Sequence, residues 1–296
     1  MTLETGPTDS LPEGRLRGLA LADLADGVAL STEASWNQNA TDWRYLLAHG
    51  LGWGYEDPSG RLRATAMLLP YEDRIAWICM VLVTAGWRKR GLATMLLRHC
   101  IEAGEQRGWQ LGLDATPAGR QVYLPLGVSD CYPIARMTAE GLQIPGPADR
   151  SRCRPMQESD LPAVGDLDAA VAGAARHDLL RSLFSRAPDL CWVCGPPENL
   201  RGFCLGRDGL NSDQIGPIVA RHQDSAIALA RQALLSRRQP ARRVCIDVTE
   251  EQCAFRDWLQ TVGFQVERNF VRMMKMTTRK VGRPAALFAI AGPELS

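Results

Sequence analysis

The stretch RIAWICMVLVTAGWRKRGLATMLLRHCIEAGEQR, residues 74–107, determines how the rest of the chain is interpreted. Its first part, Ile75 to Val83, is a nearly continuous apolar run rich in β-branched residues, which predicts a buried strand. A loop with two glycines and three basic residues follows. From Leu92 onward, apolar residues recur at three- and four-residue steps, as on one face of a helix. Such a unit brings free backbone N–H groups and the positive end of a helix together beside cationic side chains. It therefore predicts a site for an anion, most naturally phosphate or pyrophosphate.

Two common phosphate-binding loops do not fit this stretch. A P-loop requires GxxxxGK[ST], and no GK[ST] occurs in the chain. A dinucleotide fingerprint requires GxGxxG, and the spacing of Gly86 and Gly91 is wrong for it. The loop instead contains Arg88-Lys89-Arg90-Gly91-Leu92-Ala93, of the form R-x-x-G-x-A. The alternative is a solvated basic turn without a ligand.

With the strand before it and the helix after it, this pattern resembles the acyl-CoA pyrophosphate loop of the GNAT (Gcn5-related) N-acetyltransferases. The resemblance implies acetyl-CoA as the cofactor, clamped by the loop N–H groups and by the preceding strand. The backbone around Met80 to Leu82 is then expected to polarise the thioester carbonyl. The implied cofactor-binding residues are Val81, Leu82, Val83, Arg88, Lys89, Arg90, Gly91, Leu92, Ala93 and Thr94.

Length and composition exclude several other classes of protein. A chain of 296 residues favours two domains, and 46% apolar with 23% charged residues is ordinary for a soluble globular protein. The net charge of +1 gives no general basic field for nucleic acid. No apolar run approaches the length of a membrane span, and the first residues lack the apolar stretch of a secretory signal, so neither feature is expected. Nine cysteines in a chain of this size predict no disulfide framework, and hence a reduced, cytoplasmic protein.

The chain repeats itself after a linker. Four patterns recur at separations of 137, 136, 133 and 136 residues, which indicates a diverged tandem duplication. In the first copy the patterns are Arg17 with Asp23, Val81–Val83, Leu113–Thr116, and Gly127 with Arg136. Their counterparts in the second copy are, in the same order, Arg154 with Asp160, Pro217–Val219, Ile246–Thr249, and Gly263 with Arg272.

Alternating helices and strands predict an α/β protein. With the resemblance, the expected fold is two tandem GNAT (acyl-CoA N-acyltransferase) domains, each a mixed, splayed β-sheet flanked by helices. The predicted parts are a mobile leader at 1–14, a catalytic domain at 15–139, a linker at 140–151, a degenerate domain at 152–275 and a tail at 276–296 that docks on the domains.

The second copy differs where the chemistry is expected. After Val219 there is no R-x-x-G-x-A, and Asp224 at the start of the next helix would repel a pyrophosphate. Leu259 stands where the first copy has Tyr123. The second copy is therefore expected to be structural, with the further option that it forms one wall of the substrate site.

Tyr123 is the predicted catalytic acid. The run from Gly119 to Val128 resembles the helix end at which the family places a tyrosine hydroxyl facing the cofactor sulfur, although Gly119 and Val128 depart from the family pattern. A phenol with a pKa of about 10 protonates a leaving thiolate because it is well positioned. The alternative is a tyrosine that only packs.

Asp114 is the predicted catalytic base or substrate-ammonium binder, since it ends the strand expected to diverge from the cofactor strand. Asp247 occupies the matching place in the degenerate copy, which leaves a shared structural role open. Water relays through Glu72 or Asp73 are further alternatives.

The acceptor-binding residues are expected in the loop between the first two helices. An aromatic ring with amide side chains suits a small polar amine, and the alternative is that the tryptophans only pack the helices together. The predicted substrate-binding residues are Trp36, Asn37, Gln38, Trp43 and Trp77.

The function expected from the resemblance is acetyl-CoA-dependent N-acetylation of a small amine, such as an amino acid, a polyamine or an amino sugar. Direct attack in a ternary complex is expected, with no metal, nucleic-acid or membrane partner. The alternatives are acetylation of a protein N-terminus or lysine, and a non-catalytic acyl-CoA-binding module. The oligomeric state, monomer or homodimer, stays open.

Overall fold

The computed structural model describes residues 11–72, 74–146, 152–275 and 283–296, so parts of the predicted leader, linker and tail lie outside the described residues. The chain divides into two compact units. Unit 1 comprises Met1–Leu69 and Ile78–Gly108, and unit 2 comprises Pro70–Trp77 and Trp109–Ser296.

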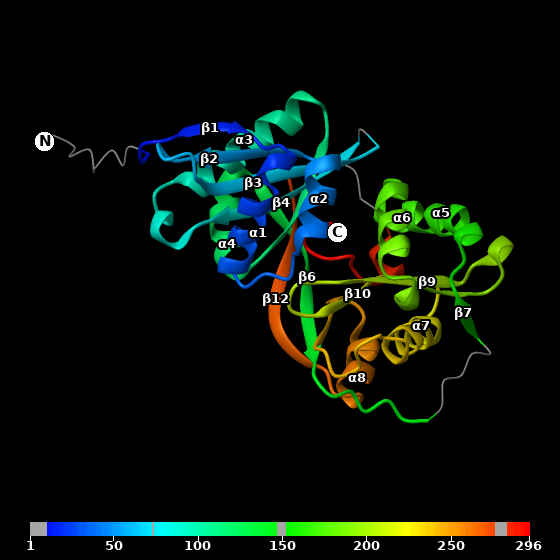
Figure 1. The fold of residues 1–296 in the computed structure, drawn as a ribbon. Coiled ribbons are helices and arrows are strands. Elements are labelled where there is room, and N and C mark those ends of the chain that lie inside the picture. Colours follow the sequence, from blue (N-terminus) through cyan, green and yellow to red (C-terminus); the bar gives the residue numbers. More distant parts are fainter. Residues whose placement is uncertain (1–10, 73, 147–151, 276–282) are drawn as a thin grey trace, which may run out of the picture. The chain divides into compact units, whose positions relative to one another are not determined.

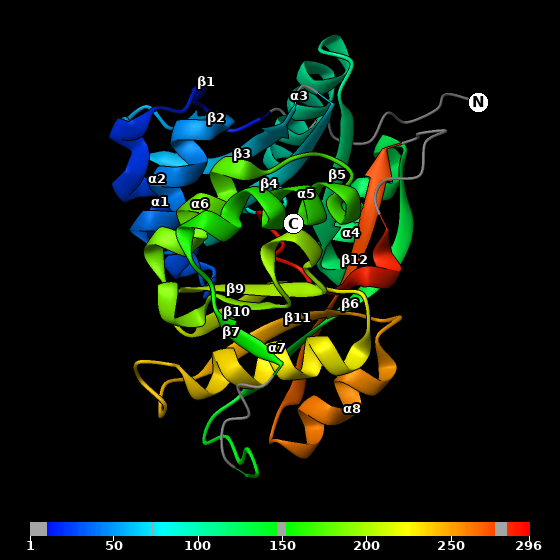
Figure 2. The same cartoon turned by 90° about the vertical axis from the view of Figure 1, so that its right-hand side faces the viewer.

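The strands of unit 1 lie in the order β1-β2-β3-β4. β1 pairs antiparallel with β2, and β2 pairs antiparallel with β3. Helices α1 and α2 lie on one face of this sheet and α3 lies on the other (Figure 2). The elements are β1 (Arg15–Gly18), α1 (Leu24–Glu33), α2 (Ala40–His49), β2 (Leu51–Glu56), β3 (Leu62–Tyr71), β4 (Ile75–Val83) and α3 (Leu92–Gln106). The last residues of β3 and the first of β4 belong to unit 2.

Unit 2 contains a longer run of strands in the order β5-β12-β6-β11-β13-β10-β9-β8-β7. Helices α5 and α6 lie on one face of the β9–β10 part of this sheet, and α7 and α8 lie on the other (Figures 1 and 2). The elements are β5 (Gln110–Ala115), α4 (Pro117–Tyr123), β6 (Val128–Ala139), β7 (Cys153–Pro155), α5 (Leu161–Ala172), α6 (His177–Arg186), β8 (Trp192–Cys194), β9 (Gly202–Asp208), β10 (Asp213–Ala220), α7 (Gln223–Leu235), β11 (Val244–Thr249), α8 (Cys253–Thr261), β12 (Gln265–Lys275) and β13 (Leu287–Ala289).

The two copies exchange their last strands. By sequence, β6 ends the first copy, but it pairs antiparallel with β11 of the second copy. Conversely, β12 ends the second copy and pairs antiparallel with β5 of the first. The two exchanged strands also pair with each other, along almost the whole of β6. Because of this exchange, the compact units do not coincide with the copies that the sequence repeat defines.

The tail residues 287–291 fill a gap in the sheet of the second copy. β10 and β11 run parallel and pair only from Asp213–Ile215 to Val244–Ile246. Beyond this point β13 lies between them, antiparallel to both, with Ala289 opposite Ile218 on one side and Val248 on the other. Ile290 N–H also donates to Asp247 C=O at 3.0 Å.

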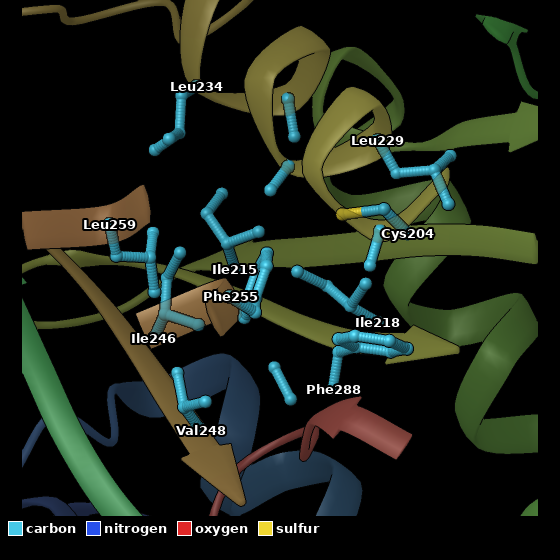
Figure 3. Close-up of a cluster of buried hydrophobic side chains, with 14 of the residues drawn as sticks. Cys204, Ile215, Ile218, Leu229, Leu234, Ile246, Val248, Phe255, Leu259 and Phe288 are labelled. Atoms are coloured by element: carbon cyan, nitrogen blue, oxygen red, sulfur yellow. The ribbon is translucent and has the colours of Figure 1, made fainter. Parts of the chain in front are cut away.

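β13 completes the core of the second copy. Phe288 packs with apolar residues of β10, β11, α7 and α8, and its ring meets the ring of Phe255 edge to face at 5.5 Å between centroids (Figure 3). Phe288 itself is 4% exposed. Burying an aromatic side chain of this size stabilises a fold by about 1.5–3 kcal/mol, so the tail is part of the fold.

One pair of cysteines departs from the reduced state that the sequence predicts. Cys153 of β7 and Cys194 of β8 are directly opposite each other in the antiparallel ladder, and their sulfurs are bonded. The remaining seven cysteines are in no disulfide, and Cys194 takes no part in a C-x-x-C bond with Cys191. Among the described helices, none has the length and apolar character required to span a bilayer.

Candidate active site

The backbone of β4 is interrupted at Met80, where φ is +50°. A non-glycine residue in this left-handed region turns the adjacent peptide groups out of the regular ladder. The side chain of Met80 is buried, and its carbonyl accepts a hydrogen bond of 2.7 Å from the Thr65 hydroxyl. Leu82 is buried, whereas Val81 and Val83 are half-buried. The interruption therefore lies at the residues predicted to polarise a thioester.

The loop after β4 presents uncapped backbone donors at the start of α3. Gly91 precedes the helix with φ at +79°, a conformation that glycine adopts without the Cβ penalty. Among the described residues no side chain caps this helix end, so the first amides of α3 receive no side-chain acceptor from that part of the chain. Lys89 also has positive φ, at +60°. Backbone N–H groups at a helix start of this kind are donors that phosphate oxygens accept from, so the loop keeps the features that the sequence predicts for an anion site.

Two arginines lie beside the ring of Trp87, Arg63 from β3 and Arg90 from the loop. The guanidinium groups of Arg63 and Arg90 lie 5.6 and 5.8 Å from the centre of its ring. Arg88 donates from Nε to the carbonyl of Val83 at 2.9 Å, which fixes the loop to the end of β4. Arg88, Lys89 and Arg90 are all exposed. The loop therefore presents three cationic side chains to solvent.

Glu33 is a positioning residue that the sequence reasoning missed. Its carboxylate accepts from the Thr84 hydroxyl at 2.6 Å and from the Ala85 N–H at 2.5 Å. The Thr84 hydroxyl, and then the Ala85 amide, hold the pKa of Glu33 below its usual value. Glu33 therefore fastens the start of the loop to the end of α1. No local pattern around Glu33 signals this contact, because it depends on how α1 packs.

The predicted acceptor residues of unit 1 have different environments. Trp43 is 1% exposed, donates from Nε1 to Ser31 Oγ at 2.8 Å and packs against Gly27, so it joins α2 to α1 as a core residue. Trp36 is half-buried in the loop between these helices. Asn37 and Gln38 are both 5% exposed. The side-chain carbonyl oxygen of Gln38 is buried without a hydrogen-bond partner among the described residues.

Asp114 lies in a buried cluster of unit 2. Both of its carboxylate oxygens accept from the Arg272 guanidinium, at 2.9 Å each, and one accepts from the Ser296 hydroxyl at 2.5 Å. The Asp114 side chain is 0% exposed. A carboxylate with this set of donors has the geometry of a structural ion pair, and its role as a base stays a prediction. Glu72 accepts from the Ala175 N–H at 2.9 Å, and Asp73 lies outside the described residues.

Arg272 also contacts Tyr132 and Trp77. It donates to the Tyr132 hydroxyl at 2.8 Å, and its guanidinium lies 4.6 Å from the centre of the Trp77 ring. Burial raises the pKa of Tyr132. Burial lowers the pKa of Arg272, but the charge of Asp114 outweighs this and raises it overall, so the guanidinium stays charged. The Trp77 indole N–H is buried without a partner among the described residues.

Tyr123 is the last residue of α4 and is half-buried. The helix begins with Pro117 after Thr116, whose hydroxyl accepts from the Gly119 N–H at 3.1 Å. A Cβ at position 119 would lie 3.2 Å from the Tyr123 hydroxyl. Glycine therefore leaves room beside the phenol at the position where the family pattern has alanine.

The second copy contains a matching Asp–Arg pair but no matching loop. Asp247, which is 0% exposed, accepts from Arg136 at 2.7 Å on each oxygen. Pro217 stands at the position of Val81 and has no N–H to offer. Asp224 lies in the first turn of α7, where its charge opposes an anion. The strand exchange explains why each aspartate pairs with the arginine of the other copy.

Family models match both halves of the chain. One described as "Acetyltransferase (GNAT) family" matches residues 21–123, and one described as "Acetyltransferase (GNAT) domain" matches residues 164–289. The chain is a tandem GNAT protein. The predicted α/β class, with two tandem GNAT domains of mixed sheet and helices, is thereby confirmed.

Solved structures with this fold include another tandem GNAT protein. The tandem GNAT chain is similar to a putative acetyltransferase from Pyrococcus horikoshii, with a TM-score of 0.77, 16% identity and coverage of 96% of each chain. It is also similar to a GCN5-related N-acetyltransferase from Sphaerobacter thermophilus, with a TM-score of 0.66, 19% identity and coverage of 90% and 96%. A tandem GNAT protein from the clavulanic acid biosynthesis pathway, solved without AcCoA, matches with a TM-score of 0.62, 14% identity and coverage of 88% and 98%. At these identities the likeness shows the fold. A comparison with curated proteins found no match.

Proposed function

We propose that this tandem GNAT protein is an acetyl-CoA-dependent N-acetyltransferase that acts on a small amine by direct attack in a ternary complex. The observation that carries the proposal is the loop at residues 84–94. It combines an uncapped helix start, a left-handed Gly91 and three exposed basic side chains. These residues fit a pyrophosphate, because backbone N–H donors and positive charge converge on one point. Acetyl-CoA, when bound, supplies the acetyl thioester.

A small amine as acceptor is supported by Gln38. Its buried side-chain oxygen has no partner among the described residues, and an unpaired buried acceptor costs about 1–3 kcal/mol. An amine N–H would satisfy it. An amino acid, a polyamine or an amino sugar could each supply such a donor. The amine must lose a proton before attack, since the pKa of an alkyl ammonium is about 10.4.

Tyr123 is the proposed acid for the departing thiolate, on the basis of its place in the family's helix-end pattern and the space that Gly119 leaves beside its hydroxyl. Its replacement by phenylalanine should lower kcat by about 10²–10⁴-fold, the range for general acid catalysis, and leave the Kd for acetyl-CoA unchanged. Tyr45→Phe, on α2, serves as the control.

A second candidate function is a non-catalytic acyl-CoA-binding module. The observation in its favour is Asp114, whose carboxylate is held by Arg272 and Ser296 instead of being available as a base. Release of free CoA in a panel of amino acids, polyamines, amino sugars and peptides separates the two. If the wild-type protein binds acetyl-CoA but acetylates no member of the panel, the enzyme proposal fails and the binding module stands.

A further inference from the structure

The second copy contains a cavity beside α5. Its volume is about 500 Å³, within the range of small-molecule sites, about 300–1,000 Å³. It is lined by one face of α5, by the turn at residues 197–200, and by residues that follow β10 and precede β13. The described residues that line it all belong to unit 2, and none of them lies in the loop at residues 84–94. The cavity is therefore built apart from the residues proposed to bind acetyl-CoA.

The sequence repeat shows what changed at this place between the copies. Helices α1 and α5 begin 137 residues apart, so Ala170 is the counterpart of Glu33. The central strands are 136 residues apart, so Arg221 is the counterpart of Ala85. In the first copy the Glu33 carboxylate accepts from the Ala85 N–H. In the second copy that carboxylate is replaced by a methyl group and the residue it bonded to is an arginine, and both replacements line the cavity.

Two arginines bring positive charge to the cavity. Arg221 follows β10, and its backbone N–H donates to Arg201 C=O at 2.9 Å. Arg283 precedes β13, and its backbone N–H donates to Val171 C=O, near the end of α5, at 2.8 Å. Both side chains are exposed, and neither guanidinium forms a hydrogen bond or ion pair with any described residue. Their N–H donors are therefore available to a carboxylate, which arginine binds through charge-assisted hydrogen bonds.

Two carboxylates line the same cavity. Asp166 of α5 and Glu198 of the turn are exposed and form no hydrogen bond or ion pair with any described residue. They would repel a ligand that carries only negative charge, such as a phosphate, and attract one that also carries an ammonium group.

The remaining wall is apolar. Leu200 and Val171 are each 5% exposed, and Leu167 is half-buried between the charged residues of α5. Such a wall stabilises a ligand by covering apolar surface that water would otherwise contact. The ligand that suits the whole cavity therefore has one carboxylate, one ammonium group and an apolar body.

We propose that this cavity binds an apolar amino acid, or a short apolar peptide, with a free amino group and a free carboxylate. The carboxylate bonds to Arg221 and Arg283. The ammonium group lies toward Asp166 and Glu198, and the apolar side chain lies on the wall between them. The inference goes beyond the proposed acetyl transfer and does not depend on it, because it gives the second copy a ligand of its own.

The test is calorimetric titration of the intact chain with L-leucine and with L-leucyl-L-leucine, which separate an amino acid from a peptide as the ligand. L-Leucinamide, which lacks the carboxylate, and 4-methylpentanoate, which lacks the amine, are the matched probes. At least one of the two zwitterions should bind at one site per chain. Each probe with a single charge should bind about 10-fold more weakly than L-leucine, since one lost charge-assisted contact corresponds to about that factor.

Variants of two exposed residues locate the site. Arg221→Ala should weaken the zwitterion and 4-methylpentanoate by about 10-fold and leave L-leucinamide unchanged, and Arg221→Lys should keep part of the affinity. Ala170→Glu returns the glutamate of the first copy to this position and should abolish binding of the carboxylate. Arg44→Ala, an exposed arginine on α2, is the control and should change no affinity.

Two results would overturn the proposal. The first is that neither zwitterion binds to the wild type at about 10 mM. The second is that a zwitterion binds to Arg221→Ala and Ala170→Glu as tightly as to the wild type, since the bound molecule would then lie elsewhere, such as at the acceptor residues of the first copy. Neither result bears on acetyl-CoA, whose titration is a separate measurement.

Discussion

The two copies of this chain share a fold and differ in the segments that follow their central strands, β4 in the first copy and β10 in the second. After β4, a glycine turn leads into the uncapped start of α3. After β10, the chain enters α7 with Asp224 in its first turn and no glycine before it. Beside β10, the tail strand β13 bonds to both β10 and β11. In the second copy, a segment of the protein's own chain thus occupies the space between the diverging strands β10 and β11.

Although only the first copy has the loop, the two copies retain the same ion pairs. Each retains a bidentate Asp–Arg pair between its penultimate strand and the exchanged last strand of the other copy. Each also retains the pair at its start, Arg17 with Asp23 and Arg154 with Asp160. Both copies therefore keep the contacts that hold the exchanged strands, whereas the loop proposed to bind an anion stands in the first copy alone.

The largest expected effect on stability is at the exchanged pairs. Asp247→Ala leaves the guanidinium of Arg136 buried without a counter-ion, which should lower the free energy of unfolding by about 3–5 kcal/mol. Asp114→Ala should cost a similar amount through Arg272. Urea unfolding measures both. A loss of less than about 1 kcal/mol at either site would contradict a structural role for that pair. If Asp114→Ala loses more activity than its unfolded fraction explains, this would support the role of Asp114 as the catalytic base.

The tail strand should matter for stability and not for cofactor binding. Phe288→Ala removes a buried ring from the core of the second copy and should cost about 3 kcal/mol or more. The Kd for acetyl-CoA, measured below the onset of unfolding, should stay within about twofold. Leu210→Ala, at an exposed position, is the control. A parallel loss of affinity in Phe288→Ala would mean that the second copy takes part in holding the cofactor.

The smallest expected effect is the pH dependence of the ion pair that both copies retain at their start. Hydrogen bonds from Arg154 hold the pKa of Asp160 below its usual value, and those from Arg17 do the same for Asp23. The charged carboxylates therefore stabilise the fold above about pH 4, and this contribution is lost as the pH falls through their lowered values. Because the arginines are partly exposed, we expect about 1 kcal/mol for each pair.

Unfolding curves of Asp160→Asn and Asp23→Asn between pH 7 and pH 2.5 measure these contributions. The deficit of each variant relative to wild type should be largest at pH 7 and should shrink below about pH 4. A deficit that does not depend on pH would show that the hydrogen bonds, and not the charges, carry the effect.

Local sequence patterns were enough to predict the strand, loop and helix at residues 74–107 and the tandem fold. The paired spacing of Arg17 with Asp23 marked a repeat, and the structure shows that it is also an ion pair. The crosswise pairing of Asp114 with Arg272 could not be predicted in this way, although both residues had been identified as repeat markers. Strand exchange leaves the hydrophobic pattern of each strand unchanged, so a sequence with this pattern fits either topology.

Contacts that depend on how the helices pack could also not be predicted from the sequence. Glu33 reaches Thr84 only because α1 ends beside the loop. Trp43 and Gln38 lie five residues apart in the same predicted acceptor region, yet one is a core side chain and the other keeps a buried oxygen without a partner among the described residues. Residue type and spacing do not separate these two environments, because burial is set by the neighbouring helix.

Titration of the intact chain with acetyl-CoA tests most directly whether the first copy alone holds the cofactor. The account predicts one binding site per chain and a weakening on the order of 100-fold, about 2.7 kcal/mol, in Gly91→Val. Gly60→Val is the matched control, because Gly60 has nearly the same φ, +81°, in an open turn, and its replacement should leave binding unchanged. Two sites per chain, or unaltered binding by Gly91→Val, would contradict the account.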